Sequence, residues 1–352
     1  MRAMNAKGAE SLQNVFKGIE KNLTMPDDEA IMQEESLAAS CLELPKEGTD
    51  WSMNILKSCK RIYTALLSLV LLLVWSAVAM AAAPDITADA AIVIDEATGQ
   101  VLYEKNADKR EYPASMTKIM TCILALEKSS PDQLVTVSRY AADVECTRLY
   151  PGYTLRMADI LQQMMMISDN GAATAVGEAV GGDEATFAAM MNEKAQAIGA
   201  VNTHFVNMNG MPDANHYSTA RDMAKIAAYA MHNDAFRQIV GTKAKNIYYI
   251  APQGHKTYCR NTNELLESYP GCTGIKTGWT SAARGCLSAA AKRGDKELIA
   301  VVMHSDDDET RFSEAAALLD YGFEQEEEAA KAAADSETTA DPALSQTAAA
   351  VH

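Results

Sequence analysis

Ser115 and Lys118 are the two residues whose types and spacing are best suited to chemistry. They stand in Pro113-Ala-Ser-Met-Thr-Lys118, ahead of an apolar run over 119–126 with helical spacing. Residues three apart share one face of a helix, so both side chains should lie together where a helix begins. A serine becomes a nucleophile when a base takes its proton, and a buried lysine can be that base because burial lowers its pKa. The alternative is an ordinary N-cap serine beside a solvated lysine.

A second motif, Ser168-Asp169-Asn170, interrupts a helix expected to begin at Thr154. At such a turn, the Ser168 hydroxyl can point into a cleft and relay a proton to a leaving amine. Asn170 offers both donors and an acceptor, so it can hold Lys118 or a substrate amide. The alternative for Ser168 is an ordinary turn serine.

A third motif, Lys276-Thr277-Gly278, lies in an expected strand over 273–280. Lys276 would add positive charge that favours a neutral Lys118 and attracts an anionic substrate, and Thr277 can donate to a carboxylate. Gly278 would let the substrate backbone lie close to the strand. The backbone N–H groups of Ser115 and Trp279 would form the oxyanion hole. The alternative for Lys276 is a solvated strand lysine.

These three motifs, in this order, resemble the active-site set of β-lactamases and penicillin-binding proteins. Over about 85–323 the chain resembles the serine-type D-alanyl-D-alanine carboxypeptidases, the low-molecular-mass penicillin-binding proteins. The supporting phrases are Ile94-Asp-Glu-Ala-Thr-Gly-Gln-Val-Leu-Tyr-Glu-Lys-Asn106, Pro113-Ala-Ser-Met-Thr-Lys-Ile-Met-Thr121, Met191-Asn-Glu-Lys-Ala195, Asn261-x-Asn263-x-Leu265-Leu266 and Gly274-Ile-Lys-Thr-Gly-Trp-Thr280.

The resemblance implies removal of the terminal D-alanine from peptidoglycan stem peptides through an acyl-enzyme on Ser115, covalent inhibition by β-lactams, and no cofactor or metal. It also implies that an arginine near the last helix helps hold the substrate carboxylate, and Arg311 fits that place; its alternative is a surface arginine. The family usually has Ser-Gly-Asn at the second motif. Asp169 departs from this pattern, and we expect its side chain to face away from the chemistry.

Two other functions are weighed against this one. A class A β-lactamase needs a deacylating glutamate in the segment that Asn202–Asn209 occupies here, which contains none. A non-catalytic wall-binding module would not need the intact motif residues. The residues do not separate carboxypeptidase from endopeptidase action, nor a diaminopimelate stem from a lysine stem.

The expected fold is α+β. Strands at both ends of the body (91–95, 100–104, 284–291 and 297–304, with 273–280) should form one antiparallel sheet, with a helical block between them and a closing helix over 310–321 packed on the sheet. The expected domain spans 84–323. An acidic, Ala-rich tail over 324–352 should be disordered.

The N-terminal region suggests export. An apolar run over 62–83 follows Lys57, Lys60 and Arg61 and ends in small residues, as in a secretory signal or an uncleaved signal-anchor that would tie the protein to a membrane. We expect translation to start at Met53, with the polar segment 1–52 as a gene-model artefact, and the body to lie outside the cytoplasm. The net charge of −16 and the lack of a basic patch argue against nucleic acid as a partner.

The body contains five cysteines, whose spacing matches no zinc pattern. Cys122, on the apolar face of the Ser115 helix, should be buried. One disulfide after export is compatible with the spacing of the last three, but the pairing stays open. The five are Cys122, Cys146, Cys259, Cys272 and Cys286.

Overall fold

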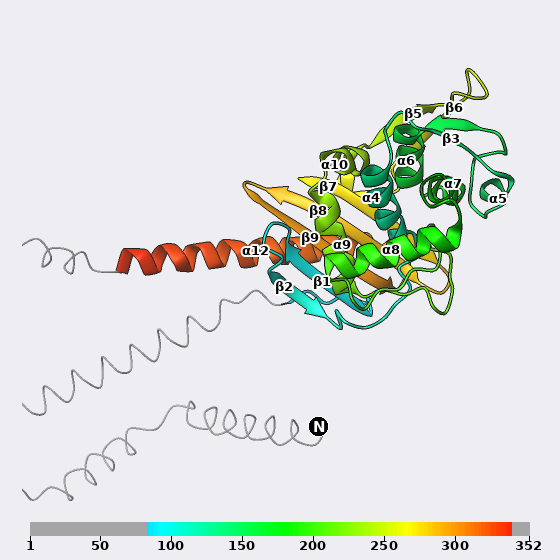
Figure 1. The fold of residues 1–352 in the computed structure, drawn as a ribbon. Helices are drawn as coiled ribbons and strands as arrows, with labels where there is room; N and C mark the ends of the chain where they lie inside the picture. Colours follow the sequence, from blue (N-terminus) through cyan, green and yellow to red (C-terminus); the bar gives the residue numbers. More distant parts are fainter. Residues whose placement is uncertain (1–82, 340–352) are drawn as a thin grey trace, which may run out of the picture. The chain divides into compact units, whose positions relative to one another are not determined.

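The computed structural model describes residues 83–339, and its centre is one antiparallel sheet of five strands (Figure 1). The strand order is β2-β1-β9-β8-β7, so the N-terminal hairpin joins the C-terminal strands, and β7 lies at the edge. This confirms the predicted α+β class and the predicted sheet. The strands are β1 (Ala90–Asp95), β2 (Val101–Lys105), β7 (Cys272–Thr280), β8 (Arg284–Arg293) and β9 (Lys296–Ser305).

Both faces of the sheet are covered, which explains why β1 is buried at every position. Side chains alternate between the two faces of a strand. Ile92 and Ile94 therefore join the core beneath the helical block, whereas Ala91 and Val93 join a second core beneath α12 (Thr310–Thr339). The predicted packing of the closing helix on the sheet is confirmed.

The helical block packs on the other face and supplies the rest of the site (Figure 1). The nucleophile motif begins it as η1 (Ala114–Thr117) and α4 (Lys118–Lys128). Buried methionines and alanines fill the spaces between its helices. The others are α6 (Met157–Met166), α7 (Asn170–Gly181), α8 (Glu184–Ile198), α9 (Ala220–Met231) and α10 (Asp234–Gly241).

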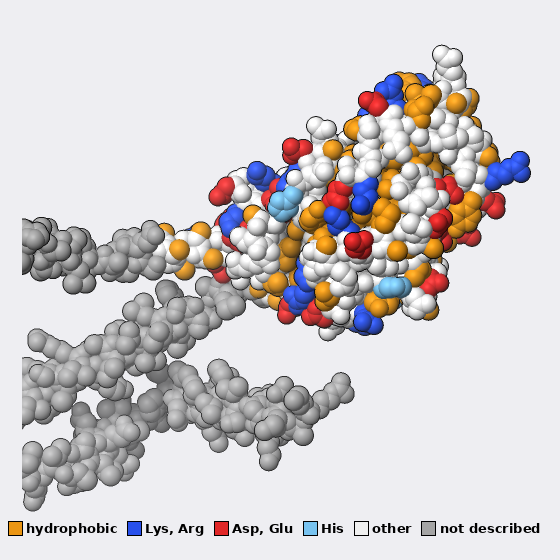
Figure 2. All heavy atoms as spheres, in the orientation of Figure 1, with side chains coloured by type: hydrophobic (Ala, Val, Ile, Leu, Met, Phe, Trp, Pro, Cys, Tyr) orange, Lys and Arg blue, Asp and Glu red, His pale blue; other side chains and the backbone are white. Residues whose placement is uncertain are grey.

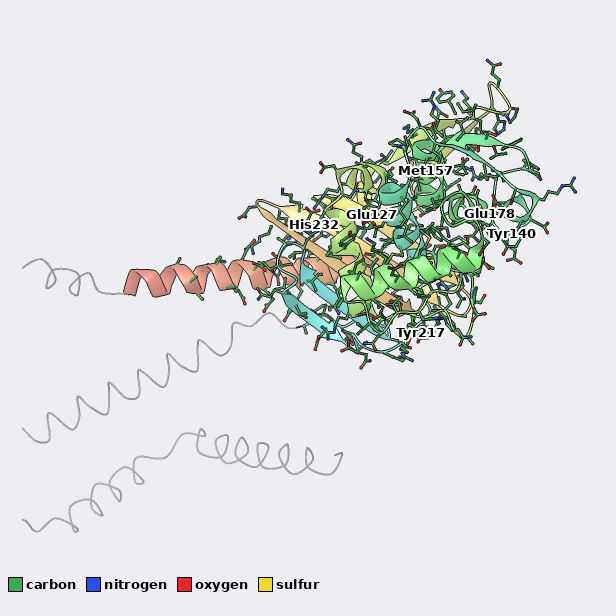
Figure 3. All side chains as sticks on the ribbon, in the orientation of Figure 1. Glu127, Tyr140, Met157, Glu178, Tyr217 and His232 are labelled. Carbon is green, nitrogen blue, oxygen red and sulfur yellow. The ribbon has the colours of Figure 1, made fainter. Side chains whose placement is uncertain are left out.

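The helical block is bordered by small elements, most of them not predicted. The hairpin β5 (Ala244–Tyr248) and β6 (Lys256–Arg260) precedes α11 (Leu265–Ser268). The strand β3 (Leu134–Thr136) pairs with β4 (Thr154–Arg156). The short helix α5 (Arg139–Ala142) packs against α7. Tyr140 of α5 and Glu178 of α7 lie on this side of the block, where Ser138 Oγ donates to Glu178 Oε1 at 3.0 Å (Figure 3).

Two predicted boundaries were wrong. Thr154 does not start a helix: it opens β4, whose hydrogen bonds to β3 take the backbone of residues 154–156 before α6 begins. The closing helix does not end before Gly322 but runs on to Thr339, through the Glu- and Ala-rich stretch expected to be disordered. Glu and Ala are strong helix formers. A Cβ at Gly322 would crowd Leu298 and Val93, so this glycine serves close packing and not termination.

Several predictions fall outside the described residues. They concern the segments 1–52 and 53–82, including most of the apolar run, and the last part of the tail, 340–352. Between 83 and 339, no helix is both apolar and long enough to cross a bilayer. All five cysteines of the described range are free thiols, and Cys122 is buried as predicted.

Candidate active site

The nucleophile turn is η1, and its position is fixed by two glycines from distant segments. Ala114 adopts a left-handed conformation with φ of 47°, which is rare for a residue with a side chain. A Cβ at Gly210 would overlap the Ala114 carbonyl, and a Cβ at Gly278 would lie 3.1 Å from the Ala114 Cβ and 3.2 Å from the Ser115 nitrogen. Because Gly278 has no side chain, β7 can approach the nucleophile turn closely. The predicted role of Gly278 was a different one, a close contact with the substrate backbone.

Lys118 is completely buried beneath Ser115, with its ammonium end among three oxygen atoms. Its Nζ lies 2.8 Å from Ser115 Oγ, 2.7 Å from Asn170 Oδ1 and 2.6 Å from the Asn209 carbonyl oxygen. Burial lowers the pKa of Lys118 to about 7, although the charge of Asp169 opposes the shift. A large fraction of Lys118 is therefore neutral at neutral pH.

The hydrogen-bond partners of Lys118 determine the direction of its lone pair when the amine is neutral. A neutral amine has two N–H bonds and one lone pair. The Asn209 carbonyl can only accept, and so can Asn170 Oδ1, whose assignment as oxygen follows because the Asn170 amide NH₂ donates to the Glu145 carbonyl at 2.9 Å. The two N–H bonds therefore point to these oxygens. The lone pair is left facing the Ser115 hydroxyl, which is the geometry a general base needs.

In the second motif, Asp169 has a structural role and its side chain does not contact Lys118. Asp169 is buried and faces away from Lys118, as predicted: it accepts bonds from Thr147 Oγ1, Gln163 Nε2 and the backbone nitrogens of Arg148 and Ala172. The Ala172 bond makes Asp169 the N-cap of α7. This network fixes the turn between α6 and α7 that carries the motif.

Ser168 lies in that turn with a left-handed φ of 60°, half-buried. Within residues 83–334 its hydroxyl makes no hydrogen bond to Ser115, to Lys118 or to another side chain. The structure thus joins Asn170 to Ser115 through Lys118 and leaves the Ser168 hydroxyl unengaged at the turn.

The third motif brings a second buried lysine to the site. Lys276 is almost fully buried, and its Nζ donates to the Thr277 carbonyl at 3.0 Å. Burial, together with the charges of Lys118 and Arg311, holds the pKa of Lys276 well below its usual range. The positive charge of Lys118 thus disfavours a second positive charge on Lys276. The influence of Lys276 on Lys118 stays a prediction.

Trp279 belongs to β7, and Arg311 of α12 contacts the same strand. The buried Arg311 guanidinium donates to the Gly278 carbonyl at 2.9 Å and pairs with Asp308, while its Nε has no partner within the described side chains. Arg311 is thus not a surface arginine. Trp279 is 46% exposed, and it follows Gly278, at which a Cβ would lie 3.2 Å from the Ser115 nitrogen.

Three contacts of the site were not predicted from the sequence. The backbone carbonyl of Asn209 carries no side-chain signature that would mark it as a ligand of Lys118. The buried His216 ring bonds Thr117 Oγ1 through Nε2 at 2.8 Å, and burial lowers its pKa to about 4, so it is neutral. The Thr277 hydroxyl lies 2.6 Å from the hydroxyl of Thr262.

Comparison with known proteins agrees with this geometry. Residues 77–307 match the Peptidase_S11 model of D-alanyl-D-alanine carboxypeptidases. The chain belongs to this family. No group of His, Cys, Asp and Glu within the described residues is arranged to hold a metal ion.

Individual relatives cover the same part of the chain. D-alanyl-D-alanine carboxypeptidase DacF of Bacillus subtilis is 36% identical over 68% of this chain and 63% of its own length. The Streptomyces sp. K15 D-alanyl-D-alanine carboxypeptidase is 35% identical over 68% of this chain and 88% of its own. The crystal structure titled Streptomyces K15 DD-transpeptidase has a TM-score of 0.66 and 34% identity, covering 69% of this chain and 99% of that one. The match thus spans less than two thirds of the Bacillus relative.

Proposed function

We propose that this protein is a serine D-alanyl-D-alanine carboxypeptidase that removes the terminal D-alanine from peptidoglycan stem peptides. The observation that carries the proposal is the buried Lys118, about half of which is neutral at pH 7 and whose Nζ lies 2.8 Å from the Ser115 hydroxyl. Family membership supports the reaction class. The substrate and the role of each residue are our inference.

Acylation begins when Lys118 takes the Ser115 proton and Ser115 Oγ attacks the penultimate D-alanine carbonyl. The developing oxyanion is stabilised by the backbone N–H groups of Ser115 and Trp279. The substrate carboxylate is held by the Thr277 hydroxyl, with Arg311 and Lys276 supplying positive charge behind it. Ser168 gives its proton to the leaving nitrogen and takes in exchange the proton that Lys118 had removed from Ser115; the C–N bond breaks, and D-alanine departs.

Deacylation consumes one water, which attacks the ester on Ser115 and returns the proton to the serine. β-Lactams enter by the same first step, because the ring amide opens on Ser115 to give an acyl-enzyme. In class A β-lactamases, the segment that corresponds to residues 202–209 supplies the deacylating glutamate. Here this segment contains no glutamate, and the Asn209 carbonyl oxygen in it accepts a hydrogen bond from Lys118. We therefore expect a long-lived penicillin adduct.

The experiment is mass spectrometry of the whole purified protein with and without penicillin, combined with D-alanine release from diacetyl-Lys-D-Ala-D-Ala. We expect one adduct on the Ser115 peptide and D-alanine release, both lost in Ser115→Ala and kept in the control Ser129→Ala. An adduct without D-alanine release would favour the non-catalytic wall-binding module. Rapid penicillin hydrolysis without an adduct would favour a β-lactamase.

We also propose that the enzyme works on the outer side of the cytoplasmic membrane, reached through the segment 53–83 as a signal peptide or a membrane anchor. Enzymes of this family act outside the cytoplasm, where their substrate lies. N-terminal sequencing of the exported protein tests the processing: a start at Ala82 or Pro84 supports cleavage, whereas an intact apolar run supports an anchor.

A further inference from the structure

The hairpin of β5 and β6 carries an exposed aromatic face that the chemistry above does not use. Thr257 and Cys259, the inward residues of β6, are buried on the side that packs against α6. Tyr248 and Tyr258 point the other way, and their residues are 60% and 59% exposed. Because Tyr248 lies opposite Lys256 in the register of the hairpin, Tyr258 is its diagonal neighbour, roughly 7–8 Å away. The two tyrosines therefore share one outer face.

The exposed apolar surface continues around the tip of the hairpin. Ile250 is exposed there, and so is Tyr150 of the adjoining loop. The Tyr153 ring joins this loop to the hairpin, since its centre lies 5.4 Å from that of Tyr150 and 5.1 Å from that of His255. Figure 2 shows hydrophobic side chains next to Lys and Arg side chains at this end of the visible face. A contiguous group of this kind, unlike a single exposed side chain, marks an interaction surface.

Positive charge collects on the hairpin although the whole protein has a net charge of −16. The stretch 235–263 contains five Lys and Arg residues and no Asp or Glu. Its two arginines are paired with glutamates. Lys243, Lys245 and Lys256 are exposed and form no ion pair with the side chains that the structure describes. Three unpaired lysines suit an anionic ligand, but they do not make the extended basic surface that a nucleic acid needs.

The side chains of the outer face suit a carbohydrate. The C–H face of a sugar ring is apolar, so it can be buried on a tyrosine ring while the phenol reaches the hydroxyl groups of the sugar. Asn246 lies opposite Tyr258, and its amide offers both donors and an acceptor. Lys256, opposite Tyr248, supplies an ammonium for an acidic group. Aromatic rings, an amide and a cation on one face fit a sugar chain that carries negative charge.

The position of the hairpin favours a polymer over a membrane as its partner. Its tip lies at the opposite end of the body from β2 and from the start of the described chain (Figure 1). If the segment 53–83 anchors the protein, the hairpin thus points away from the membrane. The hairpin is also tied to the active site: the Tyr249 hydroxyl donates to Gln163 Oε1 at 2.8 Å, and Gln163 Nε2 donates to Asp169 of the second motif at 2.9 Å.

We propose that the outer face of the β5–β6 hairpin binds an acidic polysaccharide. Sugar rings stack on Tyr248 and Tyr258, and Lys243, Lys245 and Lys256 attract the acidic groups. Docking would hold the enzyme on a polymer of the cell wall and leave the chemistry at Ser115 unchanged. The inference therefore goes beyond the proposed function.

The test is affinity electrophoresis of the whole purified protein in native gels that contain polygalacturonate, a polysaccharide with a carboxylate on each sugar. General attraction to a polyanion is unfavourable for a protein of charge −16, so retardation reports a local site. We expect retardation that weakens as salt is raised. Tyr248→Ala and Tyr258→Ala should each raise the Kd about fivefold, and Lys256→Gln about threefold. The controls Tyr140→Ala, at a similarly exposed tyrosine of α5, and Lys128→Gln, at the end of α4, should bind like the native protein.

Circular dichroism shows whether the variants are folded. Equal mobility with and without polygalacturonate, or retardation that the three hairpin variants do not change, would overturn the inference. Equal retardation by uncharged dextran would also overturn it, and so would binding to phosphatidylglycerol vesicles without binding to the polysaccharide, which would assign the face to a membrane. Retardation by polygalacturonate without any release of D-alanine would sustain this inference while the proposed function fails.

Discussion

Asn170→Asp tests whether Lys118 is the base, because it changes the charge next to the lysine with little change in shape. In the native protein, Lys118 has a pKa of about 7, so the neutral fraction and the acylation rate should rise about tenfold from pH 6 to pH 8 and then level off. A carboxylate at the position of Asn170 Oδ1 would lie 2.7 Å from Nζ and would favour the ammonium.

The size of the effect follows from the same equilibrium. An opposite charge within about 4–6 Å moves a pKa by roughly one to three pH units. Starting from half-neutral at pH 7, a rise of one unit lowers the neutral fraction about fivefold, and a rise of two units lowers it about fiftyfold. The acylation rate at pH 7 should fall by the same factor and recover as the pH is raised, since the base itself is intact.

The assay is the pseudo-first-order rate of labelling by a fluorescent penicillin between pH 5 and pH 10. Asn246→Asp, on the surface hairpin, is the matched control and should keep the native profile. A native profile that climbs steadily to pH 10, or a variant that loses activity without a shift of its acid limb, would show that a neutral Lys118 is not the base.

Three further predictions concern the scaffold. Gly278→Ala should slow penicillin labelling at least tenfold, because its Cβ pushes the nucleophile turn, while Gly254→Ala, where no atom lies within 4 Å, should label normally despite some strain from its positive φ. Glu314→Ala should cost about 3 kcal/mol of unfolding free energy in urea, because it orphans buried donors of the N-terminal segment and of β9, whereas the exposed Glu309→Ala should cost less than about 0.5 kcal/mol. Asp169→Asn removes a charge that raises the Lys118 pKa, so the acid limb of labelling should move to lower pH; an upward or absent shift would contradict the electrostatic assignment.

The sheet could be predicted because its strands carry a simple signal. Residues such as those of β1, β8 and β9 form apolar runs of strand length bounded by turn residues, and such runs point to a buried sheet. The strand β6 carries no such signal, since its inward positions are Thr257 and Cys259, which do not show as apolar alternation. The helix α10 was missed although Asn233 caps it, because eight residues are too few for a clear period.

The site divides in the same way. Ser115, Lys118, Asn170 and Lys276 could be identified because their side chains form recognisable motifs. The structure places Ser115 and Asn170 against the buried amine of Lys118, and Lys276 within reach of its charge. The Asn209 carbonyl could not, because a backbone oxygen is common to every residue and its position depends on the tertiary path of the loop. The same holds for the contact between Thr262 and Thr277, which joins two unremarkable residues.

The two glycine contacts on Ala114 have a consequence for how the protein becomes active. Gly210 arrives with a loop of the helical block and Gly278 with β7, so the reactive turn is bounded by segments far from it along the chain. Contacts of this kind form late, because the intervening chain must be ordered first. A chain that has not yet docked its edge strand would hold every residue of the first two motifs and still react poorly with penicillin. Labelling intensity, followed during refolding or export, therefore reports the number of fully folded molecules and not the amount of polypeptide present.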